Sequence, residues 1–145
     1  MPDDSILLPE NDARSLVLIV EDVGVQIRLV QICLERADYR VIAARDGGEA
    51  LRQVTEHMPD LILLDVDLPV LNGFQVLDTL RKEEATRSIP VVMLTAHAKD
   101  SALFEQWATQ ADTFLTKPFS PNALLQTVQQ VLASSRESTP PTLPI

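Results

Sequence analysis

Cysteine is almost absent from the 145-residue sequence, in which Cys33 is the single thiol. One cysteine excludes an internal disulfide bond and favours the reducing conditions of the cytoplasm. We therefore expect a cytoplasmic protein in which Cys33 is a small core residue of a helix rather than a reactive thiol.

Long apolar segments and positive charges are also scarce. No apolar run approaches the roughly 18 residues of a membrane-spanning helix. The acidic start, Met1–Ser5, lacks the basic and apolar regions of a signal peptide. The net charge is −9, with only three lysines in the chain. A nucleic-acid-binding domain shows a basic face, so we expect no direct nucleic-acid partner. The lack of a membrane-spanning run leads us to expect no membrane partner. The acidic balance is compatible with divalent cations and with protein partners.

Apolar residues are plentiful, at 46% of the chain, and their pattern predicts the fold. Short apolar runs predict buried strands at 15–20, 39–44, 61–65, 90–95 and 113–116. Amphipathic stretches predict helices at 25–37, 46–57, 74–84, 99–110 and 120–133. Five strand–helix units indicate the α/β class, with a doubly wound, five-stranded parallel sheet of order 2-1-3-4-5, the flavodoxin-like (βα)5 fold. A barrel would need eight such units.

The composition changes at both ends of this pattern. Residues 1–14 are polar and acidic, which predicts a flexible N-terminal arm. Residues 135–145 are rich in Pro, Ser and Thr, which predicts a flexible tail with no second domain after it. One domain is therefore expected at 15–134. Its first helix is expected to bury a broad apolar face made of Val25, Ile27, Leu29, Val30, Ile32, Cys33 and Leu34.

Polar residues stand where four of the predicted strands end. They are Glu21 and Asp22 after the first strand, Asp65 on the third, Thr95 on the fourth and Lys117 after the fifth. In a sheet of this order the carboxyl ends of the strands form the edge where ligands bind. Carboxylates that converge there raise one another's pKa unless a cation joins them. Mg²⁺ fits best, because it needs few protein carboxylates and keeps waters that a phosphate can replace, and Mn²⁺ could substitute for it.

The same residues are suited to phosphoryl transfer. An Asp carboxylate can attack phosphorus and form an aspartyl phosphate, and the reaction depends mainly on placement and charge neutralisation. One candidate mechanism makes Asp65 the nucleophile. Glu21 and Asp22 would then hold Mg²⁺, while Lys117 and Thr95 would contact phosphate oxygens.

Four longer motifs contain these residues. They are Val20-Glu21-Asp22, Leu61–Pro69 with Asn72-Gly73, Val91–Ala96, and Phe114–Phe119. Over about residues 15–134 the chain resembles a response-regulator receiver domain of two-component signalling, of the stand-alone type. The resemblance implies a protein that takes its phosphoryl group from a histidine kinase or a phosphotransfer protein and acts on a downstream protein target. It implies no turnover of external substrates, since such a domain catalyses its own phosphorylation and slow dephosphorylation.

The resemblance assigns roles to single residues of the site. Asp65 corresponds to the phosphoacceptor, Asp22 to a direct Mg²⁺ ligand, and Glu21 to the acid that acts through water. Asp67 stands where a backbone carbonyl also binds the metal. Lys117 corresponds to the phosphate-contacting lysine, and its bond to the following proline is expected to be cis.

Other positions correspond to regulatory features. Thr95 and Phe114 match the switch pair of the family, with Phe where Tyr is frequent. Asp67 and His97 match positions that tune the lifetime of the phosphate. Gln110 stands where Gly is frequent, before the fifth strand.

Leu103 and Trp107 form a pair four residues apart on the fourth predicted helix. The resemblance places them on the face made by helix 4, strand 5 and helix 5. If exposed, they would form a docking surface or a homodimer interface. The alternative is that Trp107 is buried in the core.

Two other functions compete with this interpretation. Asp65-Val66-Asp67 after an apolar strand resembles the nucleophile motif of haloacid-dehalogenase-type phosphatases. In those enzymes this strand comes first, whereas here Glu21 and Asp22 precede it. A degenerate receiver would be a phosphorylation-independent binding module, and the complete set of site residues argues against it.

Overall fold

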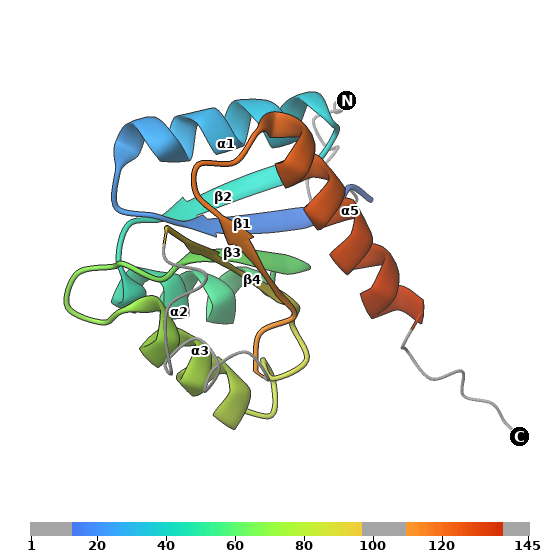
Figure 1. Cartoon of the computed structure of the whole chain (residues 1–145). Helices are drawn as coiled ribbons and strands as arrows, with labels where there is room; N and C mark the ends of the chain where they lie inside the picture. The colour runs from blue at the N-terminus through green and yellow to red at the C-terminus, as the bar shows by residue number, and fades with distance from the viewer. Residues whose placement is uncertain (1–12, 97–109, 138–145) are drawn as a thin grey trace, which may run out of the picture.

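The structure is a computed structural model that describes residues 13–96 and 110–137. The elements, in chain order (Figure 1), are β1 (Leu16–Val20), α1 (Gly24–Arg36), β2 (Arg40–Ala44), α2 (Gly47–His57), β3 (Leu61–Asp65), α3 (Gly73–Lys82), β4 (Val91–Thr95), β5 (Thr113–Thr116) and α5 (Pro121–Glu137). Strands and helices alternate as the sequence predicts. The helix expected at 99–110 lies, except for its last residue, outside the described residues.

The five strands form one parallel sheet of order β2-β1-β3-β4-β5. β1 and β3 are neighbours at its centre, with Val17 paired to Leu61 and Val20 to Leu64. The predicted α/β class, strand order and doubly wound topology are therefore confirmed. This order sets the ends of β1 and β3 side by side, with the end of β4 next to them.

Apolar cores fill both faces of the sheet, as the layers in Figure 1 show. Leu18 and Ile62 pack with residues of α2 and α3 on one face. Val17 and Leu61 pack with residues of α1 and α5 on the other. Successive side chains of a strand point to opposite faces, so every position of β1 and β3 is buried. Coverage on both faces explains why these strands are continuously apolar in sequence.

The buried face of α1 is narrower than the sequence indicated. Its buried residues are Ile27, Val30 and Leu34. By contrast, Val25, Leu29 and Ile32 are 69%, 63% and 37% exposed. The expectation that these three are core residues was wrong, because a helix buries one stripe of its surface and the apolar residues here extend beyond that stripe. Cys33 is partly buried against the core, and burial raises the pKa of its thiol.

This division of α1 predicts different costs for two leucines on the same helix. Leu34 is fully buried, so Leu34→Ala should lower the free energy of unfolding by about 2–5 kcal/mol through the cavity that it leaves. Leu29→Ala removes an exposed side chain and should change it by about 0.5 kcal/mol or less. Urea denaturation of both variants measures the difference. Equal losses would mean that Leu29 is a core residue after all.

Side-chain caps mark the starts of three helices. Asp46 caps α2, where its Oδ1 accepts from the Glu49 N–H at 2.8 Å, and Ser120 caps α5, where its Oγ accepts from the Ala123 N–H at 3.0 Å. Asn72 is the N-cap of α3 and forms a capping box with Gln75. α5 continues to Glu137, so the first residues of the predicted tail are helical.

Within the described parts of the chain, no helix combines the length and the apolar character that crossing a bilayer requires.

Candidate functional site

The ends of β1 and β3 bring the predicted acidic residues together. Asp65 is the last residue of β3 and is 3% exposed, and Glu21, directly after β1, is 2% exposed. Asp22 follows and is accessible to solvent. Carboxylate oxygens of these three residues lie within 4.8 Å of one another. The convergence expected from the strand order is therefore present.

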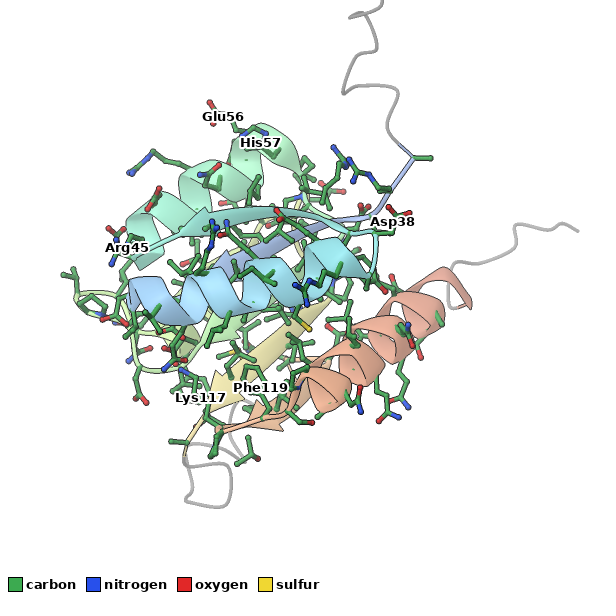
Figure 2. The ribbon with its side chains drawn as sticks, turned by 90° about the horizontal axis from the view of Figure 1, so that it is seen from above. Asp38, Arg45, Glu56, His57, Lys117 and Phe119 are labelled. Atoms are coloured by element: carbon green, nitrogen blue, oxygen red, sulfur yellow. The ribbon has the colours of Figure 1, made fainter. Side chains whose placement is uncertain are left out.

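Lys117 follows β5 and reaches the two buried carboxylates. Its Nζ donates to Glu21 Oε1 at 2.9 Å and to Asp65 Oδ2 at 3.2 Å. Its backbone N–H donates to the Thr95 carbonyl at 2.8 Å, and its bond to Pro118 is cis, as the family resemblance implied. Figure 2 shows the lysine at the edge of the sheet where the strands end. The ammonium thus compensates part of the negative charge of the site.

The charges of these groups are coupled. Burial raises the pKa of Asp65 to about 6; the backbone N–H of Asp67 and the ammonium of Lys117 oppose this rise, while the charge of Glu21 adds to it. Burial lowers the pKa of Lys117, but Glu21 and Asp65 outweigh burial and hold that pKa above its ordinary value. The lysine therefore stays cationic near neutral pH. Ionising Asp65 remains costly, and a second cation beside it would reduce that cost.

This donor set fits a hard divalent cation. Glu21, Asp22 and Asp65 offer oxygen ligands, which Mg²⁺ prefers, and Asp22 leaves the group open to water on one side. Burial, and to a smaller extent the charge of Glu21, raises the pKa of Asp65 to about 6 despite the ammonium of Lys117, so a further cation would favour its ionised form. Asp67 lies beside them, since its N–H donates to Asp65 Oδ1 at 3.1 Å, and its side chain is exposed.

The start of α3 packs against the backbone that carries Asp65. The Gly73 N–H donates to the Val66 carbonyl at 2.9 Å. A Cβ at Gly73 would press on the carbonyl oxygen of Asp65 and lie 2.8 Å from Val66 Cα. Both are backbone atoms of the strand end, so a side chain at this position would displace the loop that holds the carboxylate. The sequence showed a glycine here without indicating this contact.

Gly73→Ala should lower the free energy of unfolding by about 1–3 kcal/mol, because the added methyl group overpacks a rigid backbone contact. Gly48→Ala is the matched control: a Cβ there lies in a helix, 3.5 Å from the Asp46 carboxylate, and alanine should be neutral or stabilising by up to about 1 kcal/mol. Thermal and urea unfolding of both variants provide the measurement. Similar changes in the two variants would contradict the close approach of α3 to β3.

Thr95 and Phe114 occupy neighbouring strands. Thr95 ends β4 and is 4% exposed. Phe114, in β5, pairs with Met93 and packs, partly buried, against the core beneath α2 and α3. The structure therefore places the hydroxyl at the same sheet edge as Asp65 and the ring on the next strand. His97, Leu103 and Trp107 lie outside the described residues.

Arg45 is a site neighbour to which the sequence pattern assigned no role. It follows β2, and its Nη2 donates to the backbone carbonyl of Asp22 at 2.9 Å. Figure 2 shows Arg45 and Lys117 at the edge where the strands end. Its position after a strand was the one available signal, because contacts of a side chain with a distant backbone leave no periodic pattern.

Comparison with known proteins decides the family. The family model for the response regulator receiver domain matches residues 17–129 of the sequence. The chain belongs to this family. It is 40% identical over 116 residues to the phosphate regulon transcriptional regulatory protein PhoB of Escherichia coli K12. It is 39% identical over 124 residues to the alkaline phosphatase synthesis transcriptional regulatory protein PhoP of Bacillus subtilis. These alignments cover 80% and 86% of this chain but 51% of each relative, so the receiver chain spans about half the length of these relatives.

Solved structures agree with this assignment. The chemotaxis protein CheY4 of Vibrio cholerae has a TM-score of 0.75 and 35% identity, over 82% of this chain and 99% of that one. The receiver domain of sensor histidine kinase PA1611 of Pseudomonas aeruginosa has a TM-score of 0.77 and 30% identity, over 83% and 99%. That domain was solved with a magnesium ion coordinated in its active site cleft.

Proposed function

We propose that this receiver domain takes a phosphoryl group onto Asp65 from a histidine kinase or a phosphotransfer protein, and that phosphorylation switches a surface that binds a downstream protein. The observation that carries the proposal is the position of the Lys117 ammonium, within 3.2 Å of both buried carboxylates at the strand ends. A structural strand end would not require two buried acids, an accessible third acid and a lysine at one point.

The proposed reaction is a displacement at phosphorus. An Asp65 carboxylate oxygen forms the new O–P bond, and the bond from phosphorus to the donor breaks, with its electron pair leaving on the donor's nitrogen or oxygen. Lys117 and the Thr95 hydroxyl lie at the same edge and would neutralise and hold the phosphoryl oxygens. Water then slowly attacks the phosphorus of the aspartyl phosphate, which breaks the O–P bond to Asp65, restores the carboxylate and releases inorganic phosphate.

Glu21, Asp22, Asp65 and the backbone carbonyl of Asp67 would hold Mg²⁺. When bound, the ion supplies positive charge at the phosphoryl group. The Lys117 ammonium already contacts one carboxylate oxygen each of Glu21 and Asp65. Mn²⁺ would serve in the same positions.

The surface beside the site suits a protein donor. A groove of about 870 Å³ lies between α1 and the start of α5, and Val25, Leu29 and Lys117 are among its lining residues. The exposed apolar side chains of α1 are therefore adjacent to the lysine of the site. A donor that docks on them would present its phosphoryl group at the carboxyl ends of the strands.

The output of the domain would be a change of protein contact. A phosphoryl group adds roughly one to two negative charges, and a two-state element must convert this charge into a new surface. We assign that role to Thr95 and Phe114, with Asp67 and His97 setting the lifetime of the phosphate. We assign the binding of the target, or of a second copy, to Leu103 and Trp107, which lie outside the described residues, together with β5 and α5.

Incubation with acetyl phosphate and Mg²⁺ tests the proposal. Intact-protein mass spectrometry should show one added phosphoryl group per chain, which decays slowly. Repeated hydrolysis of phosphomonoesters would instead support the haloacid-dehalogenase-type phosphatase. A chain that never gains mass would support the phosphorylation-independent binding module.

A further inference from the structure

We propose that Arg45 is a positioning residue that holds Asp22 in place for the divalent cation; this inference rests on the metal site of the proposed function. The guanidinium Nη2 donates to the Asp22 carbonyl at 2.9 Å. Arg45 does not belong to the acidic group itself. It acts on the backbone of the one member of that group that is accessible to solvent.

Hydrogen bonds hold the residues on both sides of Asp22 in the segment between β1 and α1. Before it, the Glu21 N–H is fixed by the Ala44 carbonyl at 3.0 Å. After it, the N-cap of α1 is Val23, whose apolar side chain cannot accept a hydrogen bond from the helix. The Val23 N–H instead donates to Glu21 Oε2 at 3.3 Å. Arg45 supplies the contact to the residue in between.

Arg45 is itself well anchored. Arg45 directly precedes Asp46, the N-cap residue of α2. Its backbone N–H donates to the Oε1 of Glu49, in the first turn of α2, at 2.8 Å. Its guanidinium also lies over the start of α1, where a Cβ added to Gly24 would be 3.5 Å from Nη2. The arginine thus links the end of β2, the start of α2 and the loop that carries Asp22.

Two effects of Arg45 on the cation oppose each other. Its positive charge repels Mg²⁺, but the side chain is exposed, and 0.15 M salt screens charges over about 8 Å. Its hydrogen bond preorganises a ligand, and Mg²⁺ demands near-ideal octahedral geometry. Because residues that orient a metal ligand commonly change affinity by 10-fold or more, we expect positioning to outweigh repulsion at physiological salt.

The test is Mg²⁺ titration by isothermal calorimetry of wild type, Arg45→Met, Arg45→Lys and the control Arg52→Met, an exposed arginine of α2. Arg45→Met should raise the Kd for Mg²⁺ about 10-fold at both 0.15 M and 0.5 M KCl, the lower end of the range for residues that orient a metal ligand. Arg45→Lys should recover part of the loss, and Arg52→Met should match wild type. An Arg45→Met protein that binds as tightly as wild type, or more tightly, overturns the inference.

Phosphorylation by acetyl phosphate separates positioning from general damage. In Arg45→Met, the Mg²⁺ concentration for half-maximal rate should rise by the same factor as the Kd, with the rate at saturating Mg²⁺ unchanged. A lowered saturating rate with unchanged Mg²⁺ dependence would contradict the inference while leaving the proposed function intact. A wild type that binds no Mg²⁺ and gains no phosphoryl group would contradict both.

Discussion

Asp65→Asn should abolish phosphorylation by acetyl phosphate and make the metal-free protein more stable. The amide has no carboxylate to attack phosphorus, so no added mass should appear under conditions that label wild type. Stability should rise because the variant removes a buried charge that Glu21 repels. Loss of reaction together with a gain in stability identifies a residue that is kept for chemistry rather than for folding.

The size and the pH dependence of the gain follow from the pKa of Asp65. Folding raises that pKa from 3.8 to about 6, and a shift of about two units corresponds to roughly 3 kcal/mol. Water on the open side of the site should reduce this to about 1–2 kcal/mol near pH 7. Between pH 4 and 6 the folded state binds more protons than the unfolded state, so wild-type stability falls as pH rises through that window.

Thermal unfolding with a chelator from pH 4 to pH 8 provides the measurement. Asp65→Asn should lack the fall in stability, so the difference from wild type should grow up to about pH 7 and then level off. Asp78→Asn is the control, since Asp78 pairs with Lys82 on α3, away from the strand ends. A destabilised Asp65→Asn protein, or a difference that shrinks as pH rises, would contradict this account of the carboxylate.

Lys117→Met should lower stability and slow phosphorylation. Lys117 donates to Glu21 and Asp65, which are almost fully buried, and its removal leaves two negative charges without their cation. Breaking a buried pair in this way costs about 3–5 kcal/mol. We expect Lys117→Met to lower the free energy of unfolding by about 2–4 kcal/mol at pH 8. The loss should be smaller at pH 5, because Asp65 can take up a proton there and then carries no charge to compensate. Loss of a preorganised cation at the phosphoryl group should reduce the rate about 100-fold.

Urea denaturation at pH 5 and pH 8 tests the first part, and phosphorylation by acetyl phosphate tests the second. The control is Lys82→Met, which removes a largely exposed lysine that pairs with Asp78 on α3 and should change stability by about 0.5 kcal/mol or less. If Lys117→Met were as stable as Lys82→Met at pH 8, the lysine would not be compensating the buried acids.

Much of the site followed from the sequence because the strands are distinctive. Coverage on both faces of the sheet makes β1 and β3 continuously apolar, and the strand order then places Asp65 beside Glu21 and Asp22. The contacts of Gly73 with the strand end, and of Arg45 with Asp22, were not predicted. Each contact is made to backbone atoms of another segment, and a residue pattern does not record such contacts.

The surface of α1 was predicted poorly for a related reason. Periodicity shows that a residue is apolar but does not show how wide a stripe the neighbouring elements cover. Leu29 is apolar and exposed, whereas Leu34 on the same helix is fully buried. The role predicted for Lys117 was also incomplete. The sequence suggested a contact with phosphate, and the structure adds a hydrogen bond to Glu21, which gives the lysine a structural role as well.

We propose above that Asp65 accepts a phosphoryl group with the help of a divalent cation. The most direct measurement is mass spectrometry of the chain after incubation with acetyl phosphate, followed by peptide mapping, with Mg²⁺ and with a chelator. One phosphoryl group on the Leu61–Pro69 segment, present with Mg²⁺ and lost with the chelator or with Asp65→Asn, is the predicted result. A phosphoryl group on another residue, or an adduct that forms equally well without a divalent cation, would contradict the account.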